Sequence, residues 1–338
     1  MANNFKEIIL SKFELLRKKE TADKNPFKAR AYAKVMSQIC DLETVTSVEQ
    51  VTSLPGVGAK IKAKIEEIFA TGTLEAADRI PATTLAADQL AQVHGVGPVK
   101  AKKLIEAGIL TIDDLRAASA ADETLLHDCQ KAGLKYFDSL QERIPRAEMT
   151  KHEAFLRTYL CPEWDITVVG SYRRGAANSG DIDVLITNNH NNHSNHSNTT
   201  ITDTTMTDTT ITKEIEEKFE TMVLVFRAIG YIVPDGILAL GGRKFMGICR
   251  LSKRSKPRRL DLMLTPRSEY PYAILYFTGS DKFNIGMRGR ARELGYTMNE
   301  HTMKPLEDED HVKIVPPMES EEDIFRFLNM EWTSPTNR

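Results

Sequence analysis

The spacing of apolar residues divides the chain into two parts. Up to residue 146, apolar side chains recur every three or four positions, with breaks at 25–26 and 54–56, which predicts amphipathic helices throughout. Beyond it, short apolar runs predict strands and 213–229 predicts one more amphipathic helix. The runs that predict strands are 166–169, 184–186, 244–249 and 260–264. The pattern therefore predicts a multidomain α plus α/β fold, helical first and built on a mixed sheet afterwards.

Residues 188–212 interrupt the α/β part with a low-complexity polar segment that offers little for a core to bury. His190, His193 and His196 recur at every third position in it, a spacing compatible with metal capture. The composition favours a disordered surface insertion over a metal site, because a polar segment cannot offset its own ordering entropy.

Composition fits a multidomain intracellular protein. The chain has 338 residues, enough for roughly two or three cores, and charged residues make up 27% of it, yet the formal net charge is only −2. Affinity for nucleic acid would therefore come from local basic patches. The four cysteines form no CxxC pair, which favours a reducing compartment over a disulfide scaffold or a zinc site. The N-terminal apolar stretch contains charges, unlike a signal peptide, and no run approaches a membrane span.

The stretch 170–183 carries the most specific chemistry. Asp181 and Asp183 are two positions apart, so on an extended strand their side chains point to the same face. Like charges that close repel each other, and a cation between them removes the repulsion. At the head of the stretch, a Gly-Ser pair and two arginines offer free amides, a hydroxyl and positive charge that suit a phosphate. The stretch predicts a nucleotide-transfer site; the alternative is a polar loop with a solvated acidic end.

Asp261 is the one acid in the apolar run 260–264, which follows the basic segment 256–259. A lone carboxylate in a half-buried strand is costly unless it is paired or metal-bound. If this strand lies beside the one that carries Asp183, three carboxylates meet and can hold two hard cations. One cation then activates an attacking hydroxyl, and the other braces the triphosphate and the leaving oxygen. The alternative is a buried salt bridge from Asp261 to a neighbouring arginine.

Two related stretches, 54–65 and 93–108, share the pattern apolar-x-Gly-Val-Gly followed by a helix. Each is typical of a helix–hairpin–helix, in which glycines permit a tight turn and exposed amides meet a phosphate without contacting a base. The lysines that follow these glycines are Lys60, Lys62 and Lys64 in the first copy and Lys100, Lys102 and Lys103 in the second. One Gly-x-Gly would indicate no more than a turn, but two copies with trailing lysines predict binding to the DNA backbone.

The order of these motifs resembles that of the family X DNA polymerases, most closely DNA polymerase beta. Two helix–hairpin–helix stretches, RIPRAEM, GSYRRG…GDID, RRLDL and YFTGSDKFN follow one another, and the resemblance covers almost the whole chain. The GSxRRG…GDxD part is shared with other nucleotidyltransferases, whereas its combination with YFTGSDxFN and the hairpins is far more specific. The resemblance implies a template-directed polymerase that fills short gaps in base excision repair by two-metal nucleotidyl transfer, with an N-terminal 5′-deoxyribose-phosphate lyase.

The resemblance also implies an organisation, cofactors and partners. The four parts are a lyase-like helical domain at 1–85, a helical DNA-binding subdomain at 86–146, a polymerase-beta-like catalytic palm at 147–265 and a nucleotide- and template-binding α+β subdomain at 266–338. The implied cofactors are two Mg²⁺ ions, for which Mn²⁺ can substitute, and Na⁺ or K⁺ in the hairpins. The implied partners are gapped or nicked duplex DNA, dNTPs and other repair proteins such as a ligase, for a monomer in the nucleus with no membrane attachment.

Carried over position by position, the resemblance assigns roles to individual residues. The magnesium ligands are Asp181, Asp183 and Asp261, and the Schiff-base nucleophile of the lyase is Lys64. The residues that contact the incoming nucleotide are Arg146, Ser171, Arg174, Gly180, Tyr276, Phe277, Gly279, Asp281 and Asn284. The DNA contacts are Gly56, Gly58, Lys60, Gly95, Gly97 and Arg288. The backbone carbonyls that hold a monovalent cation belong to Leu54, Val57, Val93 and Val96.

Three positions depart from the family pattern. Ile285 replaces a lysine near the templating base, Met263 an arginine near the metal-binding aspartates, and Ala76 a lysine of the lyase pocket. Two alternatives of other classes remain: a template-independent or RNA-tailing nucleotidyltransferase, and a DNA-end-binding scaffold without catalysis. The paired hairpins argue for duplex DNA over RNA, and the three surviving carboxylates argue against a scaffold.

Overall fold

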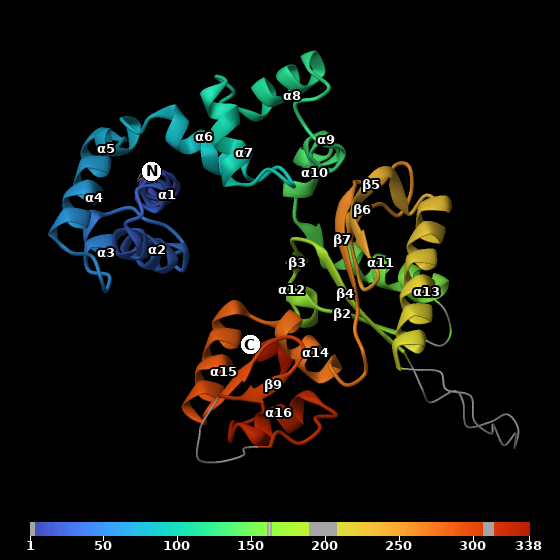
Figure 1. Ribbon diagram of the computed structural model, residues 1–338. Coiled ribbons are helices and arrows are strands. Elements are labelled where there is room, and N and C mark those ends of the chain that lie inside the picture. Colours follow the sequence, from blue (N-terminus) through green and yellow to red (C-terminus); the bar gives the residue numbers. More distant parts are fainter. Residues whose placement is uncertain (1–3, 161, 163, 189–207, 307–313) are drawn as a thin grey trace, which may run out of the picture. The chain divides into compact units, whose positions relative to one another are not determined.

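In the computed structural model the chain forms two compact units, residues 1–134 and 135–338 (Figure 1). The structure describes residues 4–160, 162, 164–188, 208–306 and 314–338. Within these ranges no helix is both long enough and apolar enough to cross a membrane. The finer boundaries expected after residues 85, 146 and 265 remain predictions.

The first unit consists of helices joined by short turns, as the apolar spacing predicts. Its helices are α1 Lys6–Ala22, α2 Pro26–Cys40, α3 Val48–Thr52, α4 Ala59–Thr71, α5 Glu75–Asp78, α6 Ala82–Leu90, α7 Pro98–Glu106, α8 Ile112–Ala121 and α9 Asp128–Lys135, whose last residue belongs to the second unit. Apolar residues three or four positions apart, such as Ile9 and Phe13 in α1 and Ile65 and Ile68 in α4, lie fully buried in one core. The prediction of amphipathic helices in this part of the chain is confirmed.

The second unit is built on a five-stranded mixed sheet with the strand order β2-β4-β7-β6-β5. The strands are β2 Trp164–Val168, β4 Ile182–Asn188, β5 Ile232–Gly241, β6 Lys244–Cys249 and β7 Arg258–Leu264, and the two-residue strands β1 Ile144–Pro145 and β3 Asn178–Ser179 form a separate ribbon. The central strands β4 and β7 are parallel, and the other neighbours in the sheet are antiparallel. The predicted mixed sheet is confirmed.

Helices cover both faces of this sheet, so its central strands alternate between two cores. Val184 and Leu262 face a core that contains Phe219 and other residues of α13 (Asp208–Ala228) and of α11 (Arg146–Tyr159). Leu185 and Met263 face a smaller cluster with α14 (Tyr270–Thr278). Because neighbouring residues of a strand point to opposite faces, nearly continuous apolar runs are what a sheet covered on both sides requires. Figure 1 shows α13 running alongside β5 and β6.

Strand β5 was not predicted, because Pro234, Asp235 and Gly236 interrupt its apolar pattern. The strand tolerates the proline because it lies at the edge of the five-stranded sheet, next to β6. Its register with β6 shifts between Ile232 and Ile237, as expected where a bulge accommodates such residues.

The expected insertion at 188–212 is shorter in the structure. Asn188 still belongs to β4, and α13 begins at Asp208 rather than at Lys213, so the backbone of 208–212 is helical. The threonines there continue the helix that the apolar residues from Ile215 onward hold against the sheet. The remainder, with its three histidines, lies outside the described residues.

The C-terminal part of the second unit packs around the junction of two helices. Its elements are α14, α15 Asp281–Glu293, β8 Tyr296–Met298, β9 Met303–Pro305, α16 Glu321–Phe327 and the 3₁₀ turn Pro335–Asn337. Two short helices, α10 Phe137–Gln141 and α12 Gly170–Arg173, come earlier in the unit. Leu275 of α14, Met287 of α15 and Phe325 of α16 share its core. Gly279 joins α14 to α15 with a φ of +63°, which a glycine adopts without strain. Helix α15 is basic towards its end, with Arg290 and Arg292 in its last turn.

Candidate active site and nucleic-acid interface

The two predicted acidic strands lie side by side. Strands β4 and β7 run parallel with Asp183 directly opposite Asp261, and Asp181 stands two residues earlier, at the entrance to β4. Burial, and next the carboxylate of Asp181, raise the pKa of Asp183 well above its ordinary value, and burial and Asp261 raise the pKa of Asp181. The structure thus gathers three carboxylates whose charges disfavour one another.

Asp261 also makes the salt bridge that was the alternative interpretation. The Nε of Arg259 donates to Oδ1 of Asp261 at 3.2 Å, and its second guanidinium nitrogen reaches Oδ2 at 3.3 Å. Among the residues that the structure describes, no three His, Cys, Asp or Glu side chains are arranged as a ready metal cluster. The donor chemistry nevertheless fits a hard cation, because three crowded carboxylates supply oxygen ligands and excess negative charge. The pairing with Arg259 offsets part of the cost of burying the Asp261 carboxylate.

The loop between β2 and β3 lies against the strand that carries Asp183. Gly170 has a φ of +60°, and a Cβ there would stand 3.0 Å from Oδ2 of Asp183, so any other residue would be strained and crowded at this position. Val169 donates its N–H to the carbonyl of Asp183. The hydroxyl of Ser171 donates to Ser179 at 3.0 Å. The loop and the acidic strand therefore form one structure, as a phosphate cradle beside a metal site would require.

Two predicted nucleotide contacts lie against the same loop. Arg146, at the start of α11, donates to the carbonyl of Tyr172 at 2.8 Å and stacks over its ring at 4.4 Å. Gly180 lies beside Arg143, whose guanidinium would stand 3.2 Å from a Cβ at that position. The structure thus brings Arg146, Ser171 and Gly180 together around one turn of backbone.

The two loop arginines have different surroundings. Arg174 donates to the carbonyl of Thr278 at 2.6 Å, so it faces the α14–α15 junction. Arg173 makes a two-ended ion pair with Glu321, at 2.6 and 3.1 Å, and also donates to the hydroxyl of Thr278. Glu321 is 5% exposed. Glu321 also accepts from Arg338 at 2.6 Å, so two arginines share this one carboxylate. That both loop arginines offer charge to a phosphate remains a prediction. Sequence reasoning missed Glu321, which carries no local motif.

The remaining nucleotide-site residues meet where α14 joins α15. Asn284 donates its side-chain amide to the carbonyl of Tyr276 at 2.8 Å, and the rings of Tyr276 and Phe277 lie edge to face. Arg288 stacks over Tyr276 at 5.0 Å and pairs with Glu300 at 3.5 Å. Gly279 approaches the guanidinium of Arg174, which would be 3.4 Å from a Cβ there. Asp281 opens α15 beside them.

The first unit contains both predicted hairpins. Gly56 and Gly95 turn the chain with φ of +96° and +78°, and Gly58 and Gly97 cap the helices α4 and α7 that follow. In the first turn the N–H of Val57 donates to the carbonyl of Leu54, and in the second the N–H of Val96 donates to the carbonyl of Val93. Exposed helix N-termini behind tight turns are suited to a phosphate.

The hairpin lysines are not equivalent. Lys60 is exposed and Lys64 is half-buried on α4, one turn apart. The Nζ of Lys62 lies 3.8 Å from Oε1 of Glu66 on the same helix. Lys100 donates to the carbonyl of Leu125, so in this structure it braces the second hairpin rather than pointing to solvent.

Family comparisons match nearly the whole chain. The models that match are the DNA polymerase beta palm at residues 143–267, the DNA polymerase beta thumb at 273–338, the fingers domain of DNA polymerase lambda at 88–141 and a helix-hairpin-helix domain at 4–74. The chain belongs to family X of the DNA polymerases. The predicted family is confirmed, while the closer resemblance to the beta member remains a prediction.

Curated relatives agree with this family X assignment. DNA polymerase lambda of Rattus norvegicus is 28% identical over 348 residues, which cover 100% of this chain and 57% of the relative. DNA polymerase lambda of Arabidopsis thaliana is 30% identical, over 87% of this chain and 54% of the relative. DNA nucleotidylexotransferase of Xenopus laevis is 26% identical, over 98% of this chain and 68% of the relative. The chain thus spans little more than half the length of the two polymerases.

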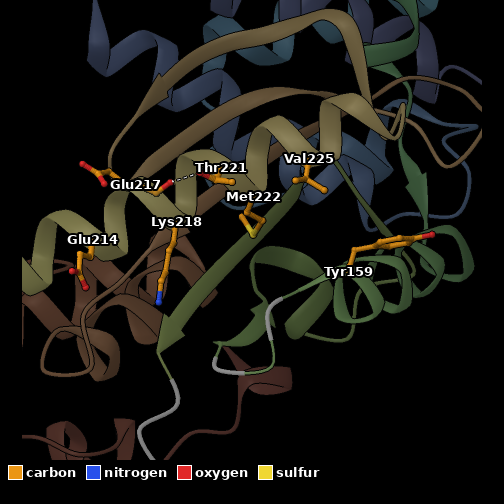
Figure 2. Close-up of a pocket in the computed structure, with 7 residues that line it drawn as sticks. All are labelled: Tyr159, Glu214, Glu217, Lys218, Thr221, Met222 and Val225. Atoms are coloured by element: carbon orange, nitrogen blue, oxygen red, sulfur yellow. Dashed lines mark hydrogen bonds between the residues drawn. The ribbon is translucent and has the colours of Figure 1, made fainter.

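A pocket of about 520 Å³ lies between α13 and the end of α11 (Figure 2). Its lining residues are Tyr159, Glu214, Glu217, Lys218, Thr221, Met222 and Val225. None of the residues that the sequence assigned to the nucleotide or the metal lines it. The pocket is therefore separate from the candidate site.

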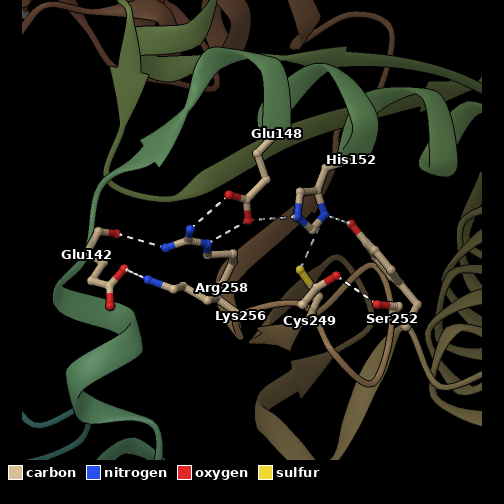
Figure 3. A network of polar contacts seen from close by, with 9 residues as sticks. Glu142, Glu148, His152, Cys249, Ser252, Lys256 and Arg258 are labelled. Carbon is tan, nitrogen blue, oxygen red and sulfur yellow. Dashed lines mark hydrogen bonds and ion pairs between the residues drawn. The ribbon is translucent and has the colours of Figure 1, made fainter.

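A network of polar contacts connects side chains of α11 with side chains of β6 and β7 (Figure 3). His152 is fully buried, and its Nδ1 shares a hydrogen bond of 2.9 Å with the hydroxyl of Tyr231. Its Nε2 lies 3.9 Å from Glu148, and the thiol of Cys249 is 3.9 Å from Nδ1. Burial lowers the pKa of His152 to about 4, against the attraction of Glu148 and helped by the charge of Arg258. The imidazole is therefore neutral near pH 7.

Because His152 is buried in its neutral form, we expect the free energy of unfolding to fall in acid. Because the pKa of His152 is lower in the folded protein than its ordinary 6.5, the unfolded chain takes up the proton first. The free energy of unfolding is therefore unaffected by this group above pH 6.5 and falls by about 3 kcal/mol as the pH drops to about 4. Urea unfolding across that interval measures the loss. A His152→Gln protein, neutral at every pH, should lack this part of it; equal losses in both proteins would contradict the assignment.

Proposed function

We propose that this chain is a template-directed DNA polymerase that fills short gaps during base excision repair. The observation that carries the proposal is the pairing of Asp183 with Asp261 across parallel strands, beside the amide-rich turn at Gly170. Carboxylates next to a phosphate cradle supply the two needs of nucleotidyl transfer, a site for cations and a grip on the triphosphate. Membership of family X supports the same activity.

Asp181, Asp183 and Asp261 would hold two Mg²⁺ ions, or Mn²⁺ in their place, since both prefer carboxylate oxygens. When bound, the ions would lower the pKa of the primer 3′-hydroxyl and neutralise charge on the triphosphate. Divalent metal dependence is general in the family. Arg259 then has to release Asp261 in part, because the same carboxylate oxygens serve both.

The chain's own residues bind and orient the nucleotide. The triphosphate would lie at the loop between β2 and β3, which carries Ser171 and Arg174. Arg146 and Gly180 lie against this loop. Tyr276, Phe277 and Gly279 would pack against the sugar, where the close backbone leaves little room for a 2′-hydroxyl. The incoming base would lie against Asp281 and Asn284, and Arg288 would contact the template in the minor groove. These placements rest on the resemblance together with the contacts at the α14–α15 junction.

The two hairpins would bind the DNA backbone on either side of a gap. Gly56, Gly58 and Lys60 in the first, and Gly95 and Gly97 in the second, would meet phosphates without contacting bases. Carbonyls of Leu54 and Val57, and of Val93 and Val96, would hold Na⁺ or K⁺ there. The DNA substrate is therefore a gapped or nicked duplex, together with dNTPs.

The proposal extends to the setting in which the chain works. We propose a monomer in the nucleus that passes its product to another repair protein such as a ligase. The spacing of the four cysteines, which form no CxxC pair, supports a reducing compartment. We also propose that Lys64 makes the first unit a 5′-deoxyribose-phosphate lyase.

Primer extension on gapped DNA with magnesium tests the proposed activity. We expect extension that copies the template base and stops when the template is removed. Extension without template would favour the nucleotidylexotransferase class, to which the Xenopus relative belongs by name. Addition to RNA ends would favour a tailing enzyme, and binding without any extension would leave a scaffold.

A second test concerns how the gap is recognised. Because the hairpins hold phosphates electrostatically, DNA affinity should fall steeply with salt and depend little on sequence. A short gap with a 5′-phosphate should be filled faster than the same gap without it, since the first unit would anchor the downstream end. Equal filling rates on the two substrates would show that residues 1–85 do not bind the phosphate.

A further inference from the structure

One partly buried ion pair ties two parts of the candidate site together. Arg258, the first residue of β7, donates through Nε to Oε1 of Glu148 at 2.8 Å and through a terminal nitrogen to Oε2 at 2.9 Å. Its other terminal nitrogen donates to the carbonyl of Glu142, where α10 ends, at 3.2 Å. The Arg258 side chain is 4% exposed and that of Glu148 is 23% exposed. Arg258 therefore holds three chain segments at once (Figure 3).

Each partner of this pair is next to a residue of the proposed machinery. Glu148 is in the first turn of α11, two residues after Arg146, which lies against the phosphate loop. Arg258 directly precedes Arg259, which pairs with Asp261 two positions further along the strand. The ion pair thus sets the position of the α11 start relative to the β7 start.

Stability alone does not explain such a pair. Taking two charges out of water costs several kcal/mol per ion before they attract each other, so apolar residues of similar size often stabilise a protein as well or better. The two-ended geometry, in contrast, restricts distance and angle, which an apolar contact does not. The hydrogen bond to Glu148 is also the largest cause that lowers the pKa of this carboxyl, so the pair is ionised near pH 7.

We infer that Glu148 is a positioning residue for nucleotidyl transfer: through Arg258 it holds Arg146 and Asp261 in register with each other. The inference rests on the proposed polymerase activity. Without the pair, the α11 start can shift relative to β7, and a misplacement of about 1 Å at a reacting group costs up to about a hundredfold in rate.

Steady-state primer extension by the full-length protein tests this on a double variant, Glu148→Gln with Arg258→Gln. Removing both charges leaves no unpaired buried ion, so the variant is expected to fold. We expect KM for dNTP to rise about tenfold and kcat to fall about tenfold, with unchanged affinity for gapped DNA. Arg258→Lys, which retains the charge without the planar fork, should show a smaller change in the same direction. If the double variant does not fold, the KM and kcat of Arg258→Lys test the inference instead.

Two controls separate positioning from stability. Glu142→Gln removes the neighbouring exposed ion pair with Lys256 and should leave KM and kcat unchanged. Tyr231→Phe removes a buried hydrogen bond to His152 in the same network and should lower the melting temperature without altering KM. Wild-type kinetics in the double variant, or the same kinetic change in Tyr231→Phe, would overturn the inference. A wild-type protein that extends no primer would instead refute the proposed function.

Discussion

The Asp183→Ala protein is expected to lose nucleotide addition by about three orders of magnitude or more, and Asp261→Ala should lose as much. The two aspartates face each other across β4 and β7, so each variant removes a ligand from the proposed metal site. The affinity for gapped DNA should change little, because the DNA contacts are assigned to the hairpins and to α15. Single-turnover extension and a binding titration on the same gapped substrate measure the two quantities.

Asp165→Ala is the matched control for these variants. Asp165 is an exposed acid on β2, the neighbouring strand of the same sheet, and its loss should leave extension unchanged. The melting temperature of Asp183→Ala should not fall, because the variant relieves repulsion among three gathered carboxylates. Extension by Asp261→Ala near the wild-type rate would show that Asp261 serves only its salt bridge with Arg259.

Lys64→Ala is expected to abolish the covalent adduct that borohydride traps on 5′-incised abasic DNA. An unprotonated amine attacks the sugar carbon, loses water to form an imine, and releases the 5′-deoxyribose phosphate by β-elimination. Lys64 is half-buried on α4, where Ile65 and Ile68 are fully buried and Ile61 is packed against the same core. The wild-type protein should form the adduct, which denaturing electrophoresis of labelled DNA measures.

Lys62→Ala is the control, since Lys62 lies on the same helix, exposed and near Glu66, and its loss should leave trapping intact. Ala76 lies on α5, where the family resemblance expects a lysine, so the reaction tests the site with that lysine missing. An active polymerase whose wild-type form yields no adduct would be a polymerase without a lyase.

Local patterns were sufficient for much of the fold and for the candidate site. Helical spacing predicted the amphipathic helices of the first unit, and the repeated Gly-Val-Gly located both hairpins, because backbone turns and amphipathic faces depend on residues close in sequence. An isolated acid in an apolar strand marked Asp261, since an uncompensated buried carboxylate is rarely tolerated. The sequence analysis did not predict strand β5. Its proline and glycine are compatible with a strand only at a sheet edge, and edge position is not a local property.

By itself, the sequence determined which residues carry the chemistry: the Asp-x-Asp pair, the glycine-serine turn, the lone Asp261 and the junction motif. Only the tertiary structure decided which of them meet and which are already engaged. The pairing of Asp183 with Asp261, the ion pair of Arg258 with Glu148 across 110 positions and that of Arg173 with Glu321 across 148 have no local pattern. The reason is physical: an arginine's partner is set by strand register and helix packing, which bring together charges that the chain keeps far apart.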